Sequence, residues 1–362
     1  MKETKEHNGI IGFWKFCFCI MIVIFHGRVF ASKGEFAFFR KGSIGVEFFF
    51  LVSGFLMAKS ALSKKDQNEK IGIETIKYVF KKIKGFAPYI FFSSLIGLVM
   101  SNIYNKLSIY ANISSVWDFL FLNMSGIDCP FINNPTWYIS AMLICMMIIY
   151  PLIRKYKHNF IYLSIPFVIL GLGWMSKTYA HLRSPFLWTG FVYKGLIRGF
   201  IELLIGSIIY VLYEKFKNIH FTKFGKIIIT LIEIIGFIIP FLLSYFIKDA
   251  QNYDFVILLI LSVSILLAFS EKTLDFKLFQ NKFVFWLEKM SLSLFVCHQP
   301  LRLFVQKSSL FTSMTYTEKL SCFVIITFII SLICTYLIEF LKKKHFVEKL
   351  KSLIILDIEE FD

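Results

Sequence analysis

This sequence has little of what a soluble domain or a disulfide-rich protein needs. Only 18% of its 362 residues are charged, whereas 57% are hydrophobic, which is too apolar a balance for a soluble domain of this length. Its seven cysteines are an odd number and show neither a Cys-x-x-Cys spacing nor a Cys/His metal pattern. We therefore expect buried thiols rather than a full disulfide set, and no metal site.

The chain also lacks the short motifs of several common functions. It contains no serine nucleophile elbow, no phosphate-binding Walker loop and no dinucleotide fingerprint. Its formal net charge of +16 is not accompanied by a nucleic-acid-binding motif, and the basic residues lie mainly between apolar blocks. We interpret this charge as a signal of membrane orientation and expect no nucleic acid partner.

Apolar blocks that are long enough to cross a bilayer make up most of the chain. A membrane-spanning helix takes about 20 residues, and we count ten such blocks. The expected fold class is therefore all-α, a polytopic membrane protein with about ten transmembrane helices. The blocks cover about 10–30, 43–62, 86–104, 135–153, 160–176, 195–213, 225–247, 254–270, 290–307 and 320–341.

The distribution of lysine and arginine predicts how these helices are oriented. If both termini are cytoplasmic, the cytoplasmic segments carry more than twice as many basic residues as the outer segments, as the positive-inside rule requires. The first block is expected to be retained, because ionisable residues interrupt it and many spans follow. We expect a transmembrane domain over residues 1–342 and an amphipathic cytoplasmic tail over 343–362.

Two ionisable residues interrupt the first block, in "FWKFCFCIMIVIFHG" (13–27). Lys15 and His26 are eleven residues apart, so they lie on one face of a helix and about 16 Å apart along its axis. Ionisable side chains inside a membrane are costly and are usually functional. Taken alone, Lys15 is also compatible with snorkelling to the interface, and His26 with a hydrogen-bonded residue of the bundle.

The second block supplies a carboxylate at a similar depth. Glu47 lies about four residues into this block, and His26 lies about four residues from the end of the first block. Both are expected roughly 6 Å below the same membrane boundary. We expect them to pair, because a carboxylate fixes the tautomer of an imidazole and raises its basicity.

Five motifs, met in order along most of the chain, resemble those of the acyltransferase-3 family of integral membrane acyltransferases. They are Lys15-x10-His26, "GVEFFFLVSGFLM" (45–57), "KKIKGFAPYI" (81–90), "NPTWYISAML" (134–143) and "SLSLFVCHQP" (291–300). The chain departs from the family pattern where the family often has arginine, at Lys15 and at Gly85.

This resemblance implies an O-acyltransferase that moves an acetyl or similar acyl group onto a hydroxyl. The implied donor is acetyl-CoA or another acyl-CoA, used as a substrate, with no permanently bound cofactor. The implied acceptor is a cell-surface polysaccharide or its lipid-linked glycan precursor. The implied setting is the lipid bilayer of a bacterial cytoplasmic (inner) membrane.

The resemblance and the chemistry together give each catalytic candidate a role. His26 is expected to act as general base toward the sugar hydroxyl, with Glu47 orienting its ring. An acyl-histidine intermediate at His26 is the alternative. Lys15 is expected to guide the negatively charged donor into the bundle, since lysines bind phosphates well.

Binding roles fall to residues at both ends of the bundle. The expected donor-binding residues are Lys15, Lys81, Lys82 and Lys84, the last three in an inner loop. At the outer end, Trp137 is expected to stack on a sugar ring, and an aromatic residue of the interfacial belt is the alternative. His298 is expected to line the acceptor cavity, beside a helix break at Pro300.

A transport function is the main alternative that the sequence leaves open. A membrane stripe of Lys, His and Glu also suits a proton-coupled transporter or a flippase of a lipid-linked glycan. Such transporters commonly have two related halves, and no internal symmetry is visible here. Arg198 and Glu202, four residues apart, are expected simply to pair on one helix.

Overall fold

The computed structural model describes residues 8–64, 70–247 and 253–342, so the expected tail at 343–362 lies outside the described residues. The described ranges form helices and no β-strand, and nine of their helices are long and apolar enough to cross a membrane. The protein is therefore an all-α polytopic membrane protein, as predicted. The orientation of the termini stays a prediction.

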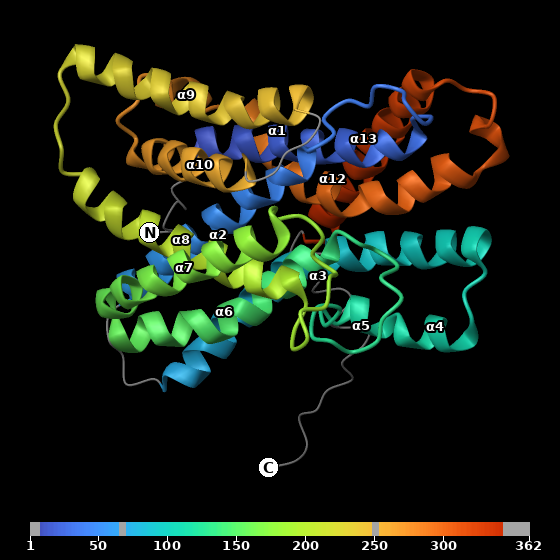
Figure 1. Ribbon diagram of the computed structural model, residues 1–362, viewed down its shortest axis with the longest axis horizontal. Coiled ribbons are helices and arrows are strands. Elements are labelled where there is room, and N and C mark those ends of the chain that lie inside the picture. Colours follow the sequence, from blue (N-terminus) through green and yellow to red (C-terminus); the bar gives the residue numbers. More distant parts are fainter. Residues whose placement is uncertain (1–7, 65–69, 248–252, 343–362) are drawn as a thin grey trace.

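Each of the ten predicted blocks corresponds to one long helix, although blocks 10–30, 43–62, 135–153 and 225–247 extend past the ends of theirs (Figure 1). These helices are α1 (Gly9–His26), α2 (Gly45–Ser63), α3 (Ile71–Asn105), α6 (Thr136–Tyr156), α7 (His158–Tyr179), α8 (Lys194–Phe216), α9 (Lys223–Phe246), α10 (Tyr253–Ser270), α12 (Lys282–Lys307) and α13 (Tyr316–Leu341). The short elements are η1 (Gly27–Phe30), η2 (Gly42–Ile44), α4 (Ile109–Ser114), α5 (Val116–Phe119), α11 (Phe276–Phe279) and η3 (Ser309–Phe311).

Polar residues cap several of these helices at their first turn. The side chains of Asn8 and Asn281 accept hydrogen bonds from backbone amides at the starts of α1 and α12. At the start of α13, Thr315 and Glu318 form a capping box. Such side chains bind backbone amides that have no hydrogen-bond partner inside the helix. An amide left without a partner costs more free energy in lipid than in water.

Two expectations about helix breaks were wrong. Residues 77–84, expected as an inner loop, lie inside α3, which spans 35 residues and continues through Pro88. A helix of that length reaches about 52 Å, so it exceeds the roughly 30 Å of bilayer hydrocarbon. The other wrong expectation concerns α12, which is continuous through Pro300. Because of its polar residues, α12 is not one of the nine helices that are apolar enough to count as membrane spans.

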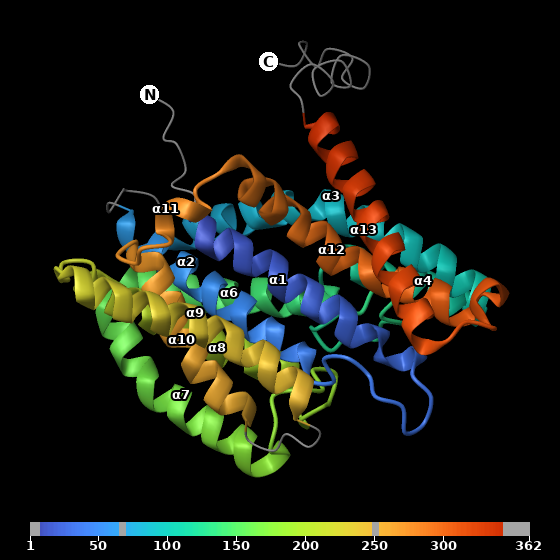
Figure 2. The same ribbon diagram turned by 90° about the horizontal axis from the view of Figure 1, so that it is seen from above.

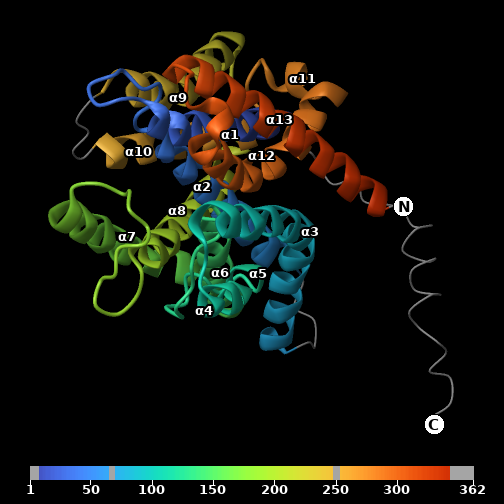
Figure 3. The ribbon, with the colours of Figure 1, turned by 90° about the vertical axis from the view of Figure 1, so that its right-hand side faces the viewer.

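The helices form two groups with α2 and α8 between them (Figures 1 and 3). One group contains α1, α9, α10, α12 and α13, and the other contains α3, α4, α5, α6 and α7. α2 and α8 approach closely at two glycines. A Cβ added to Gly54 would lie 2.2 Å from the Leu203 carbonyl oxygen, and one added to Gly206 would lie 2.3 Å from the Leu51 oxygen. This contact sets the spacing at the centre of the bundle.

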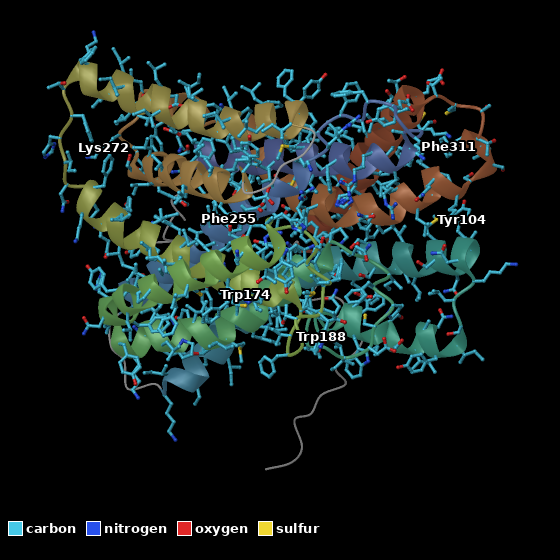
Figure 4. The ribbon with its side chains drawn as sticks, viewed as in Figure 1. Tyr104, Trp174, Trp188, Phe255, Lys272 and Phe311 are labelled. Carbon is cyan, nitrogen blue, oxygen red and sulfur yellow. The ribbon has the colours of Figure 1, made fainter. Side chains whose placement is uncertain are left out.

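Large apolar side chains also cover the outside of the bundle (Figure 4). Trp174 of α7, for example, is 40% exposed. An apolar outer surface fits a molecule surrounded by lipid, because lipid chains favour the same side chains as a protein core.

A buried carboxylate organises the segment before α6. Asp118 accepts hydrogen bonds from the Ile132 amide and the Asn123 side chain, both at 2.9 Å, and from Cys129 at 3.3 Å. Burial raises the pKa of Asp118 and raises the pKa of Cys129 to about 12, so this thiol stays protonated. All seven cysteines are free, as predicted.

Candidate functional site

The seam between α1 and α12 positions the two ionisable residues of the first helix (Figure 2). Lys15 Nζ donates to Glu288 Oε1 at 2.6 Å, and His26 Nδ1 lies 2.6 Å from Gln299 Nε2. The residue numbers differ by 273 in both pairs, so the helices run in parallel with one constant offset. Lys15 and His26 therefore share one face of α1, as their spacing predicted.

The hydrogen bond from Gln299 determines which ring nitrogen of His26 carries the proton. Arg302 Nε donates to Gln299 Oε1 at 2.6 Å, which turns the amide nitrogen of Gln299 toward His26. An amide nitrogen only donates, so Nδ1 of His26 accepts and the neutral ring carries its hydrogen on Nε2. His26 in this state presents a donor rather than a base.

His298 has the complementary arrangement. Its ring is fully buried, and its centroid lies 4.9 Å from that of His26. Its Nδ1 lies 3.3 Å from the carbonyl oxygen of Leu294, which can only accept, so Nδ1 carries the hydrogen. Within the described residues, Nε2 is buried without a hydrogen-bond partner. An unpaired buried acceptor in a native fold calls for a functional explanation.

A cavity of about 350 Å³ adjoins both imidazoles, and we call it the His26 cavity. Its walls come from α1, η1, η2, α2, the start of α6 with the two residues before it, α8, α12 and the loop between α7 and α8. The lining residues include Arg28, Asn134, Trp137, His181, Arg183, Arg198, Phe295 and Gln299 beside the two histidines.

The predicted pairing of Glu47 with His26 is not what the structure contains. Glu47 lies 2.8 Å from Arg198, and Arg198 donates its Nε to Glu202 at 2.8 Å. The three side chains are at most 2% exposed and join α2 to α8. Arg198 and Glu202 do pair, as predicted, but Arg198 also forms an ion pair with Glu47. Equal depth in the bilayer did not place Glu47 and His26 face to face.

Trp137 lies in the wall of the His26 cavity, near the start of α6. The Arg198 guanidinium lies 5.5 Å from the centre of its ring, within the range of a cation–π contact. Trp137 is 8% exposed, so it belongs to the interior of the bundle and not to an interfacial belt.

A second cavity, of about 290 Å³, adjoins the first half of α1, and we call it the Lys15 cavity. Lys15, Lys82 and Glu288 contribute its charged lining. Phe295 lines this cavity and also the His26 cavity. One aromatic side chain of α12 therefore lies at the boundary between the two cavities.

The four predicted donor-binding lysines separate into two pairs. Lys15 and Lys82 line the Lys15 cavity. Lys81 and Lys84 are exposed on α3, and Lys84 Nζ lies 4.9 Å from the centre of the Phe80 ring. The structure thus brings two of the four predicted donor-binding lysines together in one cavity.

The loop between α7 and α8 is fastened where it borders the His26 cavity. Lys194 is buried and donates to the carbonyl oxygens of His181 at 2.8 Å and of Arg183 at 2.7 Å. Asp254 accepts from the Leu182 amide at 2.9 Å. Burial and the neighbouring Lys194 and Arg183 cations lower the pKa of His181.

Sequence reasoning missed several site residues, among them Gln299, Arg183, Arg28 and Glu288. Gln299 follows His298 in the fifth motif, and its distance from Glu288 repeats the eleven-residue spacing of α1. That repeated spacing was the available signal. Arg183 lies in a loop with no pattern of its own, so nothing in the sequence singled it out.

Comparisons with known proteins agree with this architecture. A family model described as "Acyltransferase domain" matches residues 8–340, which include both cavities and all of the long helices apart from the last residue of α13. Searches of curated proteins and of solved structures returned no match. Within the described residues, no group of three or more His, Cys, Asp or Glu side chains could hold a metal ion.

Proposed function

Since this chain belongs to the acyltransferase-3 family, and is thus a membrane acyltransferase, we propose that it transfers an acetyl or similar acyl group from an acyl-CoA to a glycan hydroxyl. The acceptor is a cell-surface polysaccharide or its lipid-linked precursor. The membrane is the bacterial cytoplasmic membrane, with both termini in the cytoplasm.

One observation carries this proposal: two cavities meet at Phe295. The Lys15 cavity offers Lys15 and Lys82, which suit the negative charges of CoA. The His26 cavity offers two imidazoles and Trp137, which suit a sugar hydroxyl and the apolar face of its ring. An acyl group that extends past Phe295 would reach the imidazoles while CoA stays in the Lys15 cavity.

The hydrogen bonds of the two histidines support catalytic roles that differ from the expected ones: His298, and not His26, acts as the base. His298 Nε2, with its free lone pair, takes the proton of the acceptor hydroxyl as that oxygen attacks the thioester carbon. His26 Nε2–H donates a hydrogen bond to the carbonyl oxygen, on which negative charge develops. The carbon–sulfur bond then breaks, and the CoA thiolate takes the proton held by His298.

Glu47 has a positioning role in this proposal. Through Arg198 it fixes α2 against α8, and Arg198 contacts the Trp137 ring that lines the acceptor cavity. Lys81 and Lys84 contribute positive charge at the surface of α3, where it attracts the donor phosphates.

The test is a transfer assay in membranes with labelled acetyl-CoA and endogenous glycans. We expect His298→Ala to lower labelling by about 10²-fold or more, as for a lost general base. We expect His26→Ala to lower it by a factor on the order of 10²–10³, as for a lost oxyanion donor. His220→Ala is the matched control, because His220 is exposed and lines neither cavity.

Three outcomes would contradict parts of the proposal. Full labelling by a normally expressed His298→Ala variant would remove His298 as the base. Full labelling by His26→Ala would remove the oxyanion role. A wild-type protein that exports a lipid-linked glycan and leaves acetyl-CoA intact would replace transfer by transport.

A further inference from the structure

A buried glutamate on α9 lacks any polar partner. Glu233 is fully buried, and within the described residues neither of its carboxylate oxygens has a hydrogen-bond partner. No ion pair in the described part of the chain includes it. A carboxylate inside a membrane bundle is costly unless a cation or hydrogen-bond donors offset its charge. Glu233 lines neither the His26 cavity nor the Lys15 cavity, so the proposed catalysis does not explain it.

The neighbours of Glu233 on α9 show which way this part of the helix faces. Three residues before it, Thr230 Oγ1 accepts a hydrogen bond from the Leu274 amide at 2.9 Å. Three residues after it, a Cβ added to Gly236 would collide with Ser264 Oγ of α10. Residues three apart on a helix are neighbours on one face, and Glu233 lies midway between these two contacts. Glu233 therefore faces α10 and the segment that follows α10.

That segment brings further unpaired oxygens to the same place. Thr273 and Asp275 flank Leu274, whose amide is bound to α9. The Leu274 side chain is 53% exposed and points outward, whereas Thr273 is only 6% exposed. Within the described residues, Thr273 Oγ1 and Asp275 Oδ1 are buried without a hydrogen-bond partner. Asp275 occupies the N-cap position of α11, yet its side chain does not cap that helix.

We propose that Glu233, Thr273 and Asp275 bind a hard divalent cation, calcium or magnesium. Carboxylate and hydroxyl oxygens are the ligands that these ions prefer, whereas zinc and copper favour nitrogen and sulfur. Two carboxylates match the charge of one divalent ion, and water or backbone carbonyls complete its shell. The set has only two acidic residues, so it is not one of the groups of three or more that the described chain lacks.

The bound ion would connect α9 to α11, which in turn holds the start of α1 (Figure 2). A Cβ added to Gly9 would collide with the Phe279 carbonyl oxygen, and the rings of Phe13 and Phe279 lie 4.9 Å apart. The ion therefore stabilises the first turns of the helix that carries Lys15 and His26. Its role is structural, because it touches neither cavity.

The test is binding of calcium and of magnesium to the purified full-length protein in detergent, after treatment with a chelator. We expect saturable binding of at least one of these ions, at one ion per chain. We also expect the thermal unfolding midpoint to rise with the concentration of that ion, because it binds the folded state. Separate titrations with calcium chloride and magnesium chloride show which ion fits. Neither measurement requires acyl transfer, so the outcome does not depend on the proposed function.

Neutral variants connect this binding to the three side chains. We expect Glu233→Gln and Asp275→Asn each to weaken ion binding by about tenfold or more and to reduce the rise in midpoint. Asp275 lies outside the nine apolar helices, so its variant still tests the site if Glu233→Gln does not fold. Glu35→Gln is the matched control, because Glu35 is an exposed carboxylate of another loop, and both measurements should match wild type.

Two outcomes would overturn the cation site. If neither ion binds saturably or raises the midpoint, Glu233 is buried as an uncharged carboxylic acid. If both variants bind the ion as tightly as wild type, the ion binds elsewhere on the protein. Weakened binding in Glu233→Gln and Asp275→Asn, with binding retained in Glu35→Gln, would support the site.

Discussion

One hydrogen bond decides the chemistry available at His26. Gln299 donates to Nδ1 because Arg302 occupies the amide oxygen, so the neutral ring keeps its hydrogen on Nε2. A carboxylate at the same place would accept from Nδ1 and would leave Nε2 with a lone pair. The difference between a donor and a base therefore depends on one neighbouring side chain.

Replacing Gln299 with glutamate tests this dependence. We expect Gln299→Glu to lower kcat by a factor on the order of 10²–10³ with little change in KM for acyl-CoA, since an oxyanion donor is lost. Gln306→Glu is the matched control, because Gln306 also accepts from Arg302, at 2.9 Å, and does not contact His26. An unchanged kcat in Gln299→Glu would show that the His26 tautomer does not matter.

Sequence reasoning identified the histidines and Trp137 but not their partners. Ionisable residues inside apolar blocks are visible as exceptions to a pattern, and Trp137 stood in a motif that resembles the family's. The partner of His26 is a neutral amide, which is no such exception. Glu47 was assigned to the wrong partner because depth along a helix says nothing about how that helix is rotated toward its neighbours.

At the scale of the helices, the Lys15–Glu288 pair connects the first half of α1 to α12. Both side chains are 23% exposed, so solvent screens the pair less than a surface pair. We expect Lys15→Glu and Glu288→Lys each to lower thermal stability in detergent. We expect the double swap to recover most of the loss, with a coupling of about 1 kcal/mol.

A second ion pair of α12 provides the comparison. Lys289 and Glu339 lie 3.0 Å apart between α12 and α13 and are 38% and 43% exposed, so their coupling should be smaller. Additive losses in the Lys15 and Glu288 cycle would mean that this ion pair does not stabilise the seam.

Most of the fold could be predicted at this scale, because a bilayer requires long apolar helices. The ten blocks are ten helices, and only their ends and breaks differed. The block at 86–104 was predicted to follow an inner loop, yet α3 starts before that loop and continues through Gly85 and Pro88. Pro300 likewise leaves α12 unbroken, since helices packed in a bundle tolerate an internal proline.

At the scale of the whole molecule, Phe295 separates the Lys15 cavity from the His26 cavity. We expect Phe295→Ala to join them and to admit water to the thioester. Release of CoA without acceptor should then rise several-fold, while transfer to glycan falls, because water replaces the hydroxyl. The measurement is thiol release from acetyl-CoA compared with label in glycans.

The control for this prediction lies on the same helix. Phe283 is 65% exposed and lines neither cavity, so Phe283→Ala should change neither rate. An unchanged ratio of hydrolysis to transfer in Phe295→Ala would show that this side chain is no barrier between donor and acceptor.

The constant offset between α1 and α12 also limits how this protein can change in length. One inserted residue between Lys15 and His26 would turn the end of α1 by about 100° and move it by 1.5 Å. His26 would then leave Gln299, although every side chain of the site was retained. Removing a full turn would restore the direction of the ring but would withdraw it by about 5 Å. Substitutions along this stretch leave that geometry intact, whereas insertions and deletions do not.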